Sequence, residues 1–505
     1  MKKIIGRFIV LIPAFLIQIL WYLILLGFLE KYMALLIGIL SALSIIFVLY
    51  LVSKKDEGSY KILWLILIMA QPILGAFLYI CWGNKKTSRP LQKKLNDSRK
   101  NINIILEQSS EISESLKSVD KRASQTFEYI KKMTGFPIIK NTHTEYYPFG
   151  EGMFEDMCRE LKKAQRFIFL EYFIVQEGIF WNTIVDILAE KVEQGVDVRV
   201  MYDDLGCIST YSASNVVKLM ARKIKCIPFN PMVFVKASLN NRDHRKIMVI
   251  DGKIAFSGGI NIADEYINQK ERFGHWKDIG FKIIGKSVQS YTYMFIEFWN
   301  AFSPNKIPEK YLDNTLFEFE EKNDDGYVIS YYDSPFYPEA VSNNLFIEIL
   351  SQATEYVWFY TPYLMLGDAL LDAFVRTAER GVDVRIIMPG IPDKKVIFKI
   401  SRSYYKQLLE SGVKIYEYSA GFVHAKACIC DDKIASIGTV NLDYRSLFLH
   451  FECNSVFYNS KIVTDLKNDF QNTQKKCQEC TLKDEKKGIL NKIINAVLRL
   501  FAPLC

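Results

Sequence analysis

The first 83 residues contain three long runs without a charged side chain. They cover residues 8–29, 33–52 and 62–83, and Pro72 and Gly75 interrupt the third run. A bilayer-crossing helix needs about 20 apolar residues, whereas a cleavable signal peptide has a shorter apolar region followed by small residues. The pattern therefore predicts transmembrane helices rather than buried core helices, with residues 1–84 forming a membrane anchor of two to three hydrophobic helices.

Basic residues flank these runs at 2–7, 54–61 and 85–100. Lys and Arg beside membrane segments favour the cytoplasmic side, so three full crossings cannot satisfy all three groups. We therefore expect a multi-pass protein of the cell membrane whose third run forms a re-entrant or interfacial hairpin, with its catalytic part in the cytoplasm. The polar stretch at 85–134 is rich in helix formers and is predicted to be a helical connector.

Beyond residue 134, strand-like and helix-like segments alternate, and the pattern occurs twice. Gly-Val-Asp-Val-Arg stands at 195–199 and again at 381–385, each time between an amphipathic helical stretch and an apolar run. Strand, helix and strand at this spacing are typical of βαβ units. The sequence predicts an α/β fold of two pseudo-symmetric halves with mixed sheets, at 135–322 and 323–485. An amphipathic tail at 486–505 is expected to lie on the bilayer or to pack on the domain surface.

A short motif, His-x-Lys-x4-Asp, occurs once in each half. Side chains alternate along a strand, so the His and the Lys project together, whereas the Asp points to the other face or lies past the strand end. The spacing predicts that His and Lys meet a substrate while Asp supports the architecture. Two copies at matched places, in a chain with only five histidines, indicate a site. The catalytic candidates are His244, Lys246 and Asp251, together with His424, Lys426 and Asp431.

Each motif is followed by a short segment with glycine at its start and asparagine at its end. Gly-Gly-Ile-Asn ends at Asn261, and Gly-Thr-Val-Asn ends at Asn441. Glycine permits a close backbone approach, and an asparagine amide can donate to a phosphate oxygen. Both asparagines are candidates for binding a substrate phosphate, although a simple turn would also explain the pattern. The remaining histidines, His143, His275 and His450, lack the motif and are expected to be structural or surface residues. His275 and His450 stand at related places in the two halves, where they could also pack near the site.

Net charge and cysteine content indicate which binding partners, which compartment and which metal sites are to be expected. The net charge of +8 fits anionic lipid headgroups or nucleic acid, and the basic cluster beside the apolar runs favours lipid. The ten cysteines show no framework spacing, which suggests free thiols in a reducing compartment. Cys477 and Cys480 form a single Cys-x-x-Cys without a second half, so we expect neither a metal nor a cofactor.

Taken together, these residues resemble the paired HKD motifs of the phospholipase D superfamily, from about residue 135 to the C-terminus. The runs at 33–52 and 62–83 resemble the membrane leader of bacterial cardiolipin synthases. The likeness implies a phosphohistidine intermediate, with His244 as nucleophile and His424 as general acid and base, although pseudo-symmetry leaves the reverse order open. Asp278 and Glu452, downstream of their respective motifs, resemble the acids that hydrogen-bond the catalytic histidines. Other similar segments are Glu171-Tyr172, Thr361-Pro362-Tyr363, Trp276-Lys277-Asp278 and Asn441-Leu442-Asp443.

If the likeness extends to the substrate, two phosphatidylglycerol molecules give cardiolipin and glycerol. A membrane-bound phospholipase D hydrolase, which uses water as acceptor, and another phosphatidyltransferase both remain open. A nuclease is disfavoured by the three apolar runs, so no nucleic acid partner is expected. A non-catalytic membrane scaffold is disfavoured by the presence of both His/Lys pairs. The oligomeric state stays open.

Overall fold

The computed structural model describes residues 33–54, 57–83, 89–101, 108–140, 142–231, 240–312, 326–484 and 488–504, and single positions at 16, 19, 20, 23 and 106. Most of the predicted helix at 8–29 lies outside the described residues. Among those described, no helix meets both the length and the apolarity that crossing a membrane requires. The expected transmembrane helices are therefore not supported by this part of the chain.

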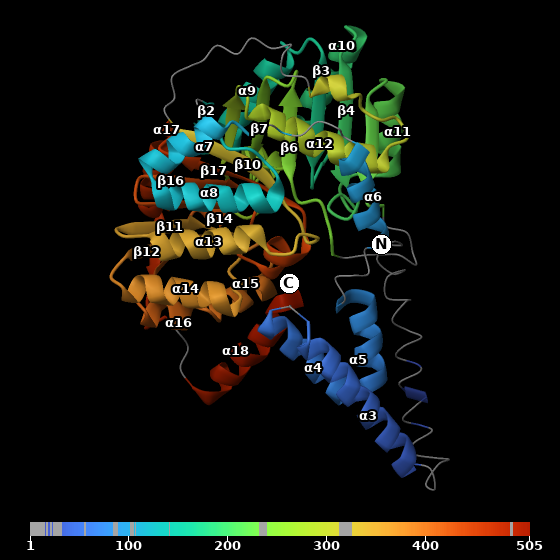
Figure 1. Ribbon diagram of the computed structural model, residues 1–505, viewed down its shortest axis with the longest axis vertical. Helices are drawn as coiled ribbons and strands as arrows, with labels where there is room; N and C mark the ends of the chain where they lie inside the picture. The colour runs from blue at the N-terminus through green and yellow to red at the C-terminus, as the bar shows by residue number, and fades with distance from the viewer. Residues whose placement is uncertain are drawn as a thin grey trace.

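Three helices lie at one end of the molecule: α3 (Met33–Val52), α4 (Gly58–Ala70) and α5 (Pro72–Leu78) (Figure 1). The predicted third run is divided, because Pro72 occupies the first turn of α5, where its missing N–H costs nothing. Gly75 packs directly on α4, and a Cβ at Gly75 would lie 2.5 Å from the Leu67 carbonyl oxygen. A turn of π-helix, η1 (Tyr79–Gly83), ends this segment.

A helical stretch joins this end to the body, as the described part of residues 85–134 shows. It contains α6 (Arg89–Asn101), α7 (Ser110–Val119) and α8 (Lys121–Thr134). The Asp120 side chain accepts the backbone N–H groups of Arg122 and Ala123 and so caps α8. Gly135, at φ +81°, ends it in the left-handed conformation.

Within the described residues, the first half folds around a seven-stranded mixed sheet. The strand order is β2 (His143–Tyr147), β9 (Gly280–Ile284), β7 (Ile254–Gly258), β6 (Lys246–Ile250), β3 (Phe167–Tyr172), β4 (Asp197–Asp203) and β5 (Lys225–Phe229). The strands β3, β4 and β5 are parallel, and the other pairings are antiparallel.

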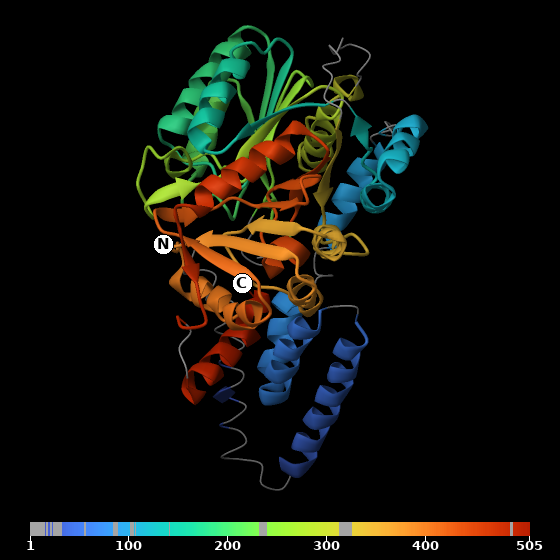
Figure 2. The same ribbon diagram turned by 90° about the vertical axis from the view of Figure 1, so that its left-hand side faces the viewer.

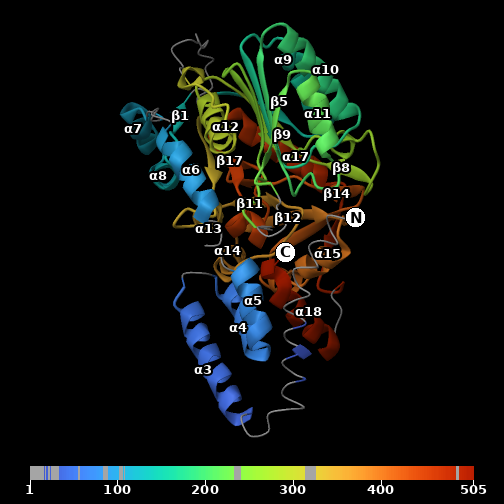
Figure 3. The ribbon, with the colours of Figure 1, turned by 90° about the vertical axis from the view of Figure 1, so that its right-hand side faces the viewer.

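Alternate side chains of this sheet face different layers. Phe169 stacks on Phe295 of α12, with 4.6 Å between ring centroids, whereas its neighbour Leu170 is buried in a second cluster with residues of α9 and α10. The helices are α9 (Gly150–Leu161), α10 (Ile179–Glu193), α11 (Ala213–Ala221) and α12 (Val288–Phe302). Figure 3 shows α12 on one side of the sheet and α9, α10 and α11 on the other.

The second half repeats this plan around a sheet of nine described strands. Their order is β1 (Ile139–Lys140), β10 (Tyr327–Asp333), β17 (Glu452–Tyr458), β16 (Ile434–Gly438), β15 (Ala427–Cys430), β11 (Tyr356–Tyr360), β12 (Asp383–Pro389), β13 (Lys414–Tyr418) and β18 (Cys477–Cys480). Its helices are α13 (Val341–Gln352), α14 (Asp368–Glu379), α15 (Lys395–Arg402), α16 (Tyr405–Glu410), α17 (Lys461–Gln474) and α18 (Ile489–Phe501). The two Gly-Val-Asp-Val-Arg segments lead into β4 and β12, which pair with β3 and β11 in the same parallel manner.

The two halves are joined closely. The strand β8 (His275–Lys277) of the first half pairs in parallel with β14 (Gly421–Val423) of the second. In addition, β1 precedes the first sheet in sequence but pairs with β10 of the second. One continuous core cluster contains side chains from both sheets, and Figure 2 shows the two halves stacked above the N-terminal helices. These connections set the position of the candidate site.

Candidate active site

The histidines of the two motifs lie just before equivalent strands, at the contact between the halves. His244 precedes β6 and His424 precedes β15, and both are buried, with exposed fractions of 8% and 7%. The backbone N–H of His244 donates to the carbonyl of Phe451 at 2.9 Å, and that of His424 donates to the carbonyl of Lys277 at 2.7 Å. Each histidine backbone is therefore held by the opposite half.

The side chains follow the same crossed arrangement. The Nδ1 atom of His244 lies 2.8 Å from Oε2 of Glu452, and Nδ1 of His424 lies 2.7 Å from Oδ2 of Asp278. Both carboxylates are fully buried. Because each Nδ1 is occupied by a carboxylate from the other half, the Nε2 atom of each ring is left for chemistry.

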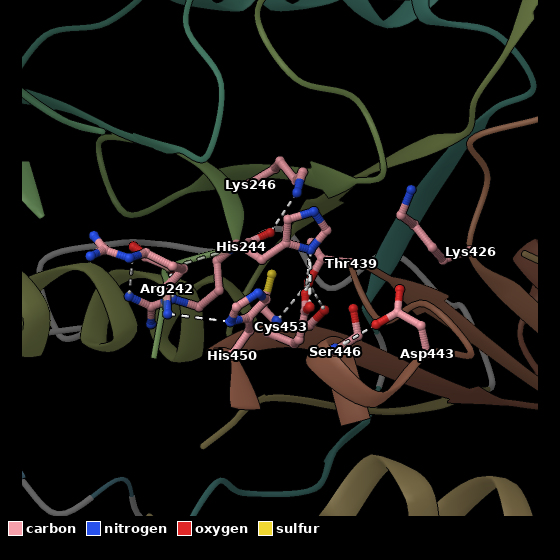
Figure 4. A network of polar contacts seen from close by, with 12 residues as sticks. Arg242, His244, Lys246, Lys426, Thr439, Asp443, Ser446, His450 and Cys453 are labelled. Atoms are coloured by element: carbon pink, nitrogen blue, oxygen red, sulfur yellow. Dashed lines mark hydrogen bonds and ion pairs between the residues drawn. The ribbon is translucent and has the colours of Figure 1, made fainter. Parts of the chain in front are cut away.

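The two motif lysines project beside the histidines, as the spacing of two residues predicts. The Nζ atom of Lys246 donates to the carbonyl of His244 at 2.5 Å, and Lys426 donates in the same way to the carbonyl of His424. Figure 4 shows both ammonium groups on the same side of the network, with the His244 ring between them. Such a pair of cations around one small volume suits a bound phosphate.

Burial and mutual repulsion shift the pKa values of these groups. Burial and the nearby charges of Lys246 and Lys426 hold the pKa of His244 well below its usual range, and burial with the charge of Lys426 lowers that of His424 to about 4. Burial lowers the pKa of Lys246 to about 8 and that of Lys426 to about 7. Both imidazoles are thus neutral near pH 7, which is the form that a nitrogen nucleophile needs.

Comparison with known proteins agrees with this geometry. The family model described as "Cardiolipin synthase, PLD-like domain" matches residues 157–278 and 346–474, one segment in each half. A second model, described as "Phospholipase_D-nuclease N-terminal", matches residues 39–84. A cardiolipin synthase of Alkalihalophilus pseudofirmus is 33% identical over 484 residues, covering 95% of each chain. The chain belongs to the phospholipase D-like cardiolipin synthase family.

Other relatives extend the comparison. A cardiolipin synthase of Halalkalibacterium halodurans is 32% identical over 438 residues, covering 86% of each chain. An uncharacterized protein of Streptococcus mutans is 45% identical over 459 residues, covering 90% of this chain and 99% of its own. Among solved structures, the phosphatidylserine synthase of Haemophilus influenzae superposes with a TM-score of 0.57 at 16% identity, covering 76% of this chain and 98% of that one. This last likeness supports the fold alone.

The two histidine–carboxylate pairs of this family member differ from each other. Burial raises the pKa of Glu452 to about 8. Burial also acts to raise the pKa of Asp278, but the charge and hydrogen bond of His424 outweigh it and lower that pKa below its ordinary value. Thr439 donates to Glu452, whereas its counterpart Gly259 has no side chain, and a Cβ there would lie 2.1 Å from Oδ1 of Asp278. The glycine of the first motif therefore makes room for the carboxylate.

The motif aspartates lie away from the histidines, although they were grouped with the catalytic candidates. Asp251 lies past the end of β6 at φ +55° and accepts the N–H groups of Gln165, Arg166 and Phe167 at 2.7–2.9 Å. Asp431 does the same for residues 354–356 at the start of β11. These contacts match the structural role that the odd spacing predicts.

The two asparagines are placed near the site but are not equivalent. Asn261 accepts the N–H of Ile174 at 3.1 Å and donates to the hydroxyl of Tyr266 at 2.8 Å. The Oδ1 atom of Asn441 is buried and has no hydrogen-bond partner within the described residues. A phosphate-binding role for either remains a prediction.

Several groups around the histidines were not predicted from the sequence. Phe173 lies edge-on to the His244 ring at 4.9 Å, and Tyr266 lies in the same manner against His424 at 5.3 Å. His450, by contrast, was expected to be structural or to pack near the site, and it accepts the backbone N–H of Arg242 at 3.4 Å beside this network (Figure 4).

Asp443, whose carboxyl lies below Lys426 in Figure 4, accepts the N–H of Ser446 at 2.8 Å. A comparison of the two halves could have indicated this residue, because the aspartate of the second half replaces Ala263 of the first. Within the described residues, no group of three or more His, Cys, Asp or Glu side chains could hold a metal ion.

Proposed function

We propose that this protein transfers a phosphatidyl group between two phosphatidylglycerol molecules, giving cardiolipin and glycerol. The observation that carries the proposal is the crossed pair of buried histidines, each oriented by a carboxylate of the other half and each close enough to feel the charge of both motif lysines. The family assignment supports phospholipids as substrates and the enzyme as a phosphatidyltransferase.

In the first half-reaction, Nε2 of His244 attacks the phosphorus of the donor lipid. A P–N bond forms and the P–O bond to the headgroup glycerol breaks. The leaving oxygen takes the Nε2 proton of His424, which enters this step as an imidazolium paired with the ionised Asp278 and leaves it as a neutral ring. Lys246 and Lys426 stabilise the charge that builds on the non-bridging oxygens. A neutral nucleophile suits this step, because an anionic one would be repelled by the phosphodiester.

In the second half-reaction, a headgroup hydroxyl of another phosphatidylglycerol gives its proton to His424, and its oxygen attacks the phosphohistidine. The P–N bond breaks, and His244 returns to its neutral form. The carboxylates of Glu452 and Asp278 keep both rings in the tautomer and orientation that these steps require, as the aspartate of a Ser-His-Asp triad does. The assignment of His244 as nucleophile follows the family pattern.

We also propose that the N-terminal helices attach the enzyme to the cell membrane, with the catalytic body on the cytoplasmic side. Large apolar side chains on α3, such as Leu43, Ile46 and Leu49, have exposed fractions of 56–63%. Exposure of this extent over a whole helix is typical of a surface that lipid covers. A thiol or fluorophore placed at the exposed Val217 in intact cells should react only after the membrane is permeabilised; reaction from outside would refute the orientation.

The reaction is tested with the full chain in vesicles that contain phosphatidylglycerol as the only lipid substrate. Mass spectrometry should detect cardiolipin and released glycerol in equal amounts. Phosphatidic acid without cardiolipin would instead identify a hydrolase. His244→Ala and His424→Ala should each abolish turnover, and clear activity of either variant would contradict the two-histidine scheme.

A further inference from the structure

The C-terminal helix α18 is oriented with its apolar face outward. Its large apolar side chains are among the most exposed of the described residues, whereas Asn491, Asn495 and Arg499, spaced four residues apart, are half-buried toward the protein. No residue of the helix is fully buried. The exposed apolar residues are Ile489, Leu490, Ile493, Ile494, Val497 and Phe501, with exposed fractions from 44% to 77%.

This orientation is fixed by specific contacts rather than by loose packing. The guanidinium of Arg499 donates to the carbonyl of Ser403 at 2.8 Å and to the side chain of Gln407 at 3.3 Å. Leu498, on the same side, packs against the main core. Past the helix, Arg445 donates to the carbonyl of Leu504 at 3.2 Å. The polar side of α18 is therefore the side docked on the body, which is the reverse of a helix that completes a water-soluble surface.

The surroundings of α18 show what covers its outer face. Figures 1, 2 and 3 place it at the same end of the molecule as α3, α4 and α5, and it contacts α4. The neighbouring α4 also exposes apolar side chains, namely Ile62, Ile66 and Met69 at 47–69%. Helices from the N-terminal and C-terminal parts of the described chain thus expose apolar side chains at the same end of the enzyme.

We propose that α18 is a second membrane-contact element, which lies in the boundary between headgroups and acyl chains of an anionic bilayer. An amphipathic helix with a basic residue such as Lys492 beside its apolar face fits this layer, because apolar side chains enter the lipid while cations meet anionic headgroups. A second copy of the chain would cover the apolar face equally well, but it would not account for the position of this face beside α4, at the same end as the exposed apolar side chains of α3.

The hydrogen bond from Arg445 to Leu504 connects α18, and with it the proposed membrane contact, to the candidate active site. Arg445 begins the π-helix η6 (Arg445–Leu449), which follows Asp443 and precedes Glu452 in the chain. Lipid contact through α18 therefore fixes the distance between the bilayer and the site residues of the second half. This inference concerns where the enzyme meets lipid, so it can be tested without turnover.

The first test uses an environment-sensitive fluorophore, introduced as a noncanonical amino acid in the full chain. At position 494 its emission should fall at least twofold when the vesicles contain lipids brominated on the acyl chains. A probe at Val217, an exposed apolar position of α11 remote from α3–α5, serves as the matched control and should not be quenched. A probe at 494 that is unquenched by bromine, or shifted by protein concentration instead of lipid, would overturn the proposal.

The second test compares the double variant Ile493→Glu/Ile494→Glu with Val217→Glu. With phosphatidylglycerol vesicles, the α18 variant should lose at least tenfold in rate, while Val217→Glu should stay within twofold of the unmodified enzyme. Circular dichroism and the melting temperature of both variants show whether the body remains folded. If the α18 variant is folded and keeps its full rate on vesicles, the helix has no role at the membrane. Absence of cardiolipin with the unmodified enzyme would contradict the reaction and leave the quenching result standing.

Discussion

The pKa values of the two motif lysines predict an unusual alkaline limit to catalysis. Lysine binds the phosphodiester only as an ammonium, and the pKa of Lys426 falls from 10.5 to about 7 because of burial and the repulsion of Lys246. At about 1.4 kcal/mol for each tenfold change, this lowering corresponds to about 5 kcal/mol of lost stability of the charged form. A phosphodiester anion about 4 Å away returns about 4 kcal/mol at an effective dielectric constant of 20.

The cost of charging Lys426 and the attraction of the phosphodiester together predict how the rate changes with pH. In the free enzyme, Lys426 loses its proton as the pH rises through about 7, and Lys246 follows near 8. In the substrate complex, the bound anion keeps both lysines protonated to higher pH. We therefore expect kcat/KM, which reports the free enzyme, to decline above about pH 7, while kcat stays level for at least one further pH unit.

Initial rates in mixed micelles of phosphatidylglycerol, at constant ionic strength between about pH 6 and about pH 9, measure both limits. Lys426→Arg keeps its positive charge across this range. Its kcat/KM should therefore not decline near pH 7, even if the longer side chain lowers the overall rate. Lys246→Arg is the matched control and should retain the limb near pH 7. If kcat/KM of the unmodified enzyme is level to pH 9, or if kcat falls together with it, the electrostatic argument is wrong.

Five further substitutions, in three tests, probe individual contacts of the site and of the motif aspartates. Asp278→Asn should lower kcat about 100-fold or more, because it removes an ionised partner of imidazolium. Glu452→Gln should cost about tenfold or less, because burial raises the pKa of that carboxyl to about 8 and so weakens the advantage of its ionised form. Equal losses in kcat for the two variants would refute this asymmetry. Gly259→Ala should reduce kcat as strongly as Asp278→Asn, since its Cβ would displace that carboxylate; a crystal structure with Asp278 unmoved would rule this out. Asp251→Ala and Asp431→Ala should each lower the free energy of unfolding by about 3 kcal/mol through loss of the acceptor for three backbone N–H groups, measured by denaturant titration; a cost below about 0.5 kcal/mol would show that water replaces the carboxylate.

The fold could be predicted because its signals are local and occur twice. Alternation along β3 and β11, the glycine-led segments before β4 and β12, and the paired motifs all lie within short stretches of sequence. The spacing of two residues also indicated that each motif lysine lies beside its histidine, although both histidines lie just before the strands and not within them. The interruption of the third run at Pro72 was also visible in the sequence. The transmembrane helices predicted from length and apolarity are not supported, because no described helix meets both requirements.

The partners of the histidines could not be predicted from the residues alone. Which carboxylate meets which ring depends on the contact between the halves, and no spacing within one half contains that information. The likeness to the family identified Asp278 and Glu452, but their crossing appears only when β8 pairs with β14 and Phe451 accepts the His244 N–H. The same is true of α18, whose apolar stripe is visible in the sequence while the direction in which it faces is not.

The crossed pairs explain why duplication did not leave two independent sites. Each half supplies one histidine and the carboxylate for the histidine of the other half, so neither half contains a complete pair of its own. Separation of the halves would expose both carboxylates and break the two backbone hydrogen bonds that hold the histidines. Because the backbone of each histidine is held by the other half, the positions of both rings depend on the packing of the same interface. The two pairs differ, one with glycine beside aspartate and one with threonine beside glutamate, and this difference is what the proposed roles of nucleophile and proton carrier would explain.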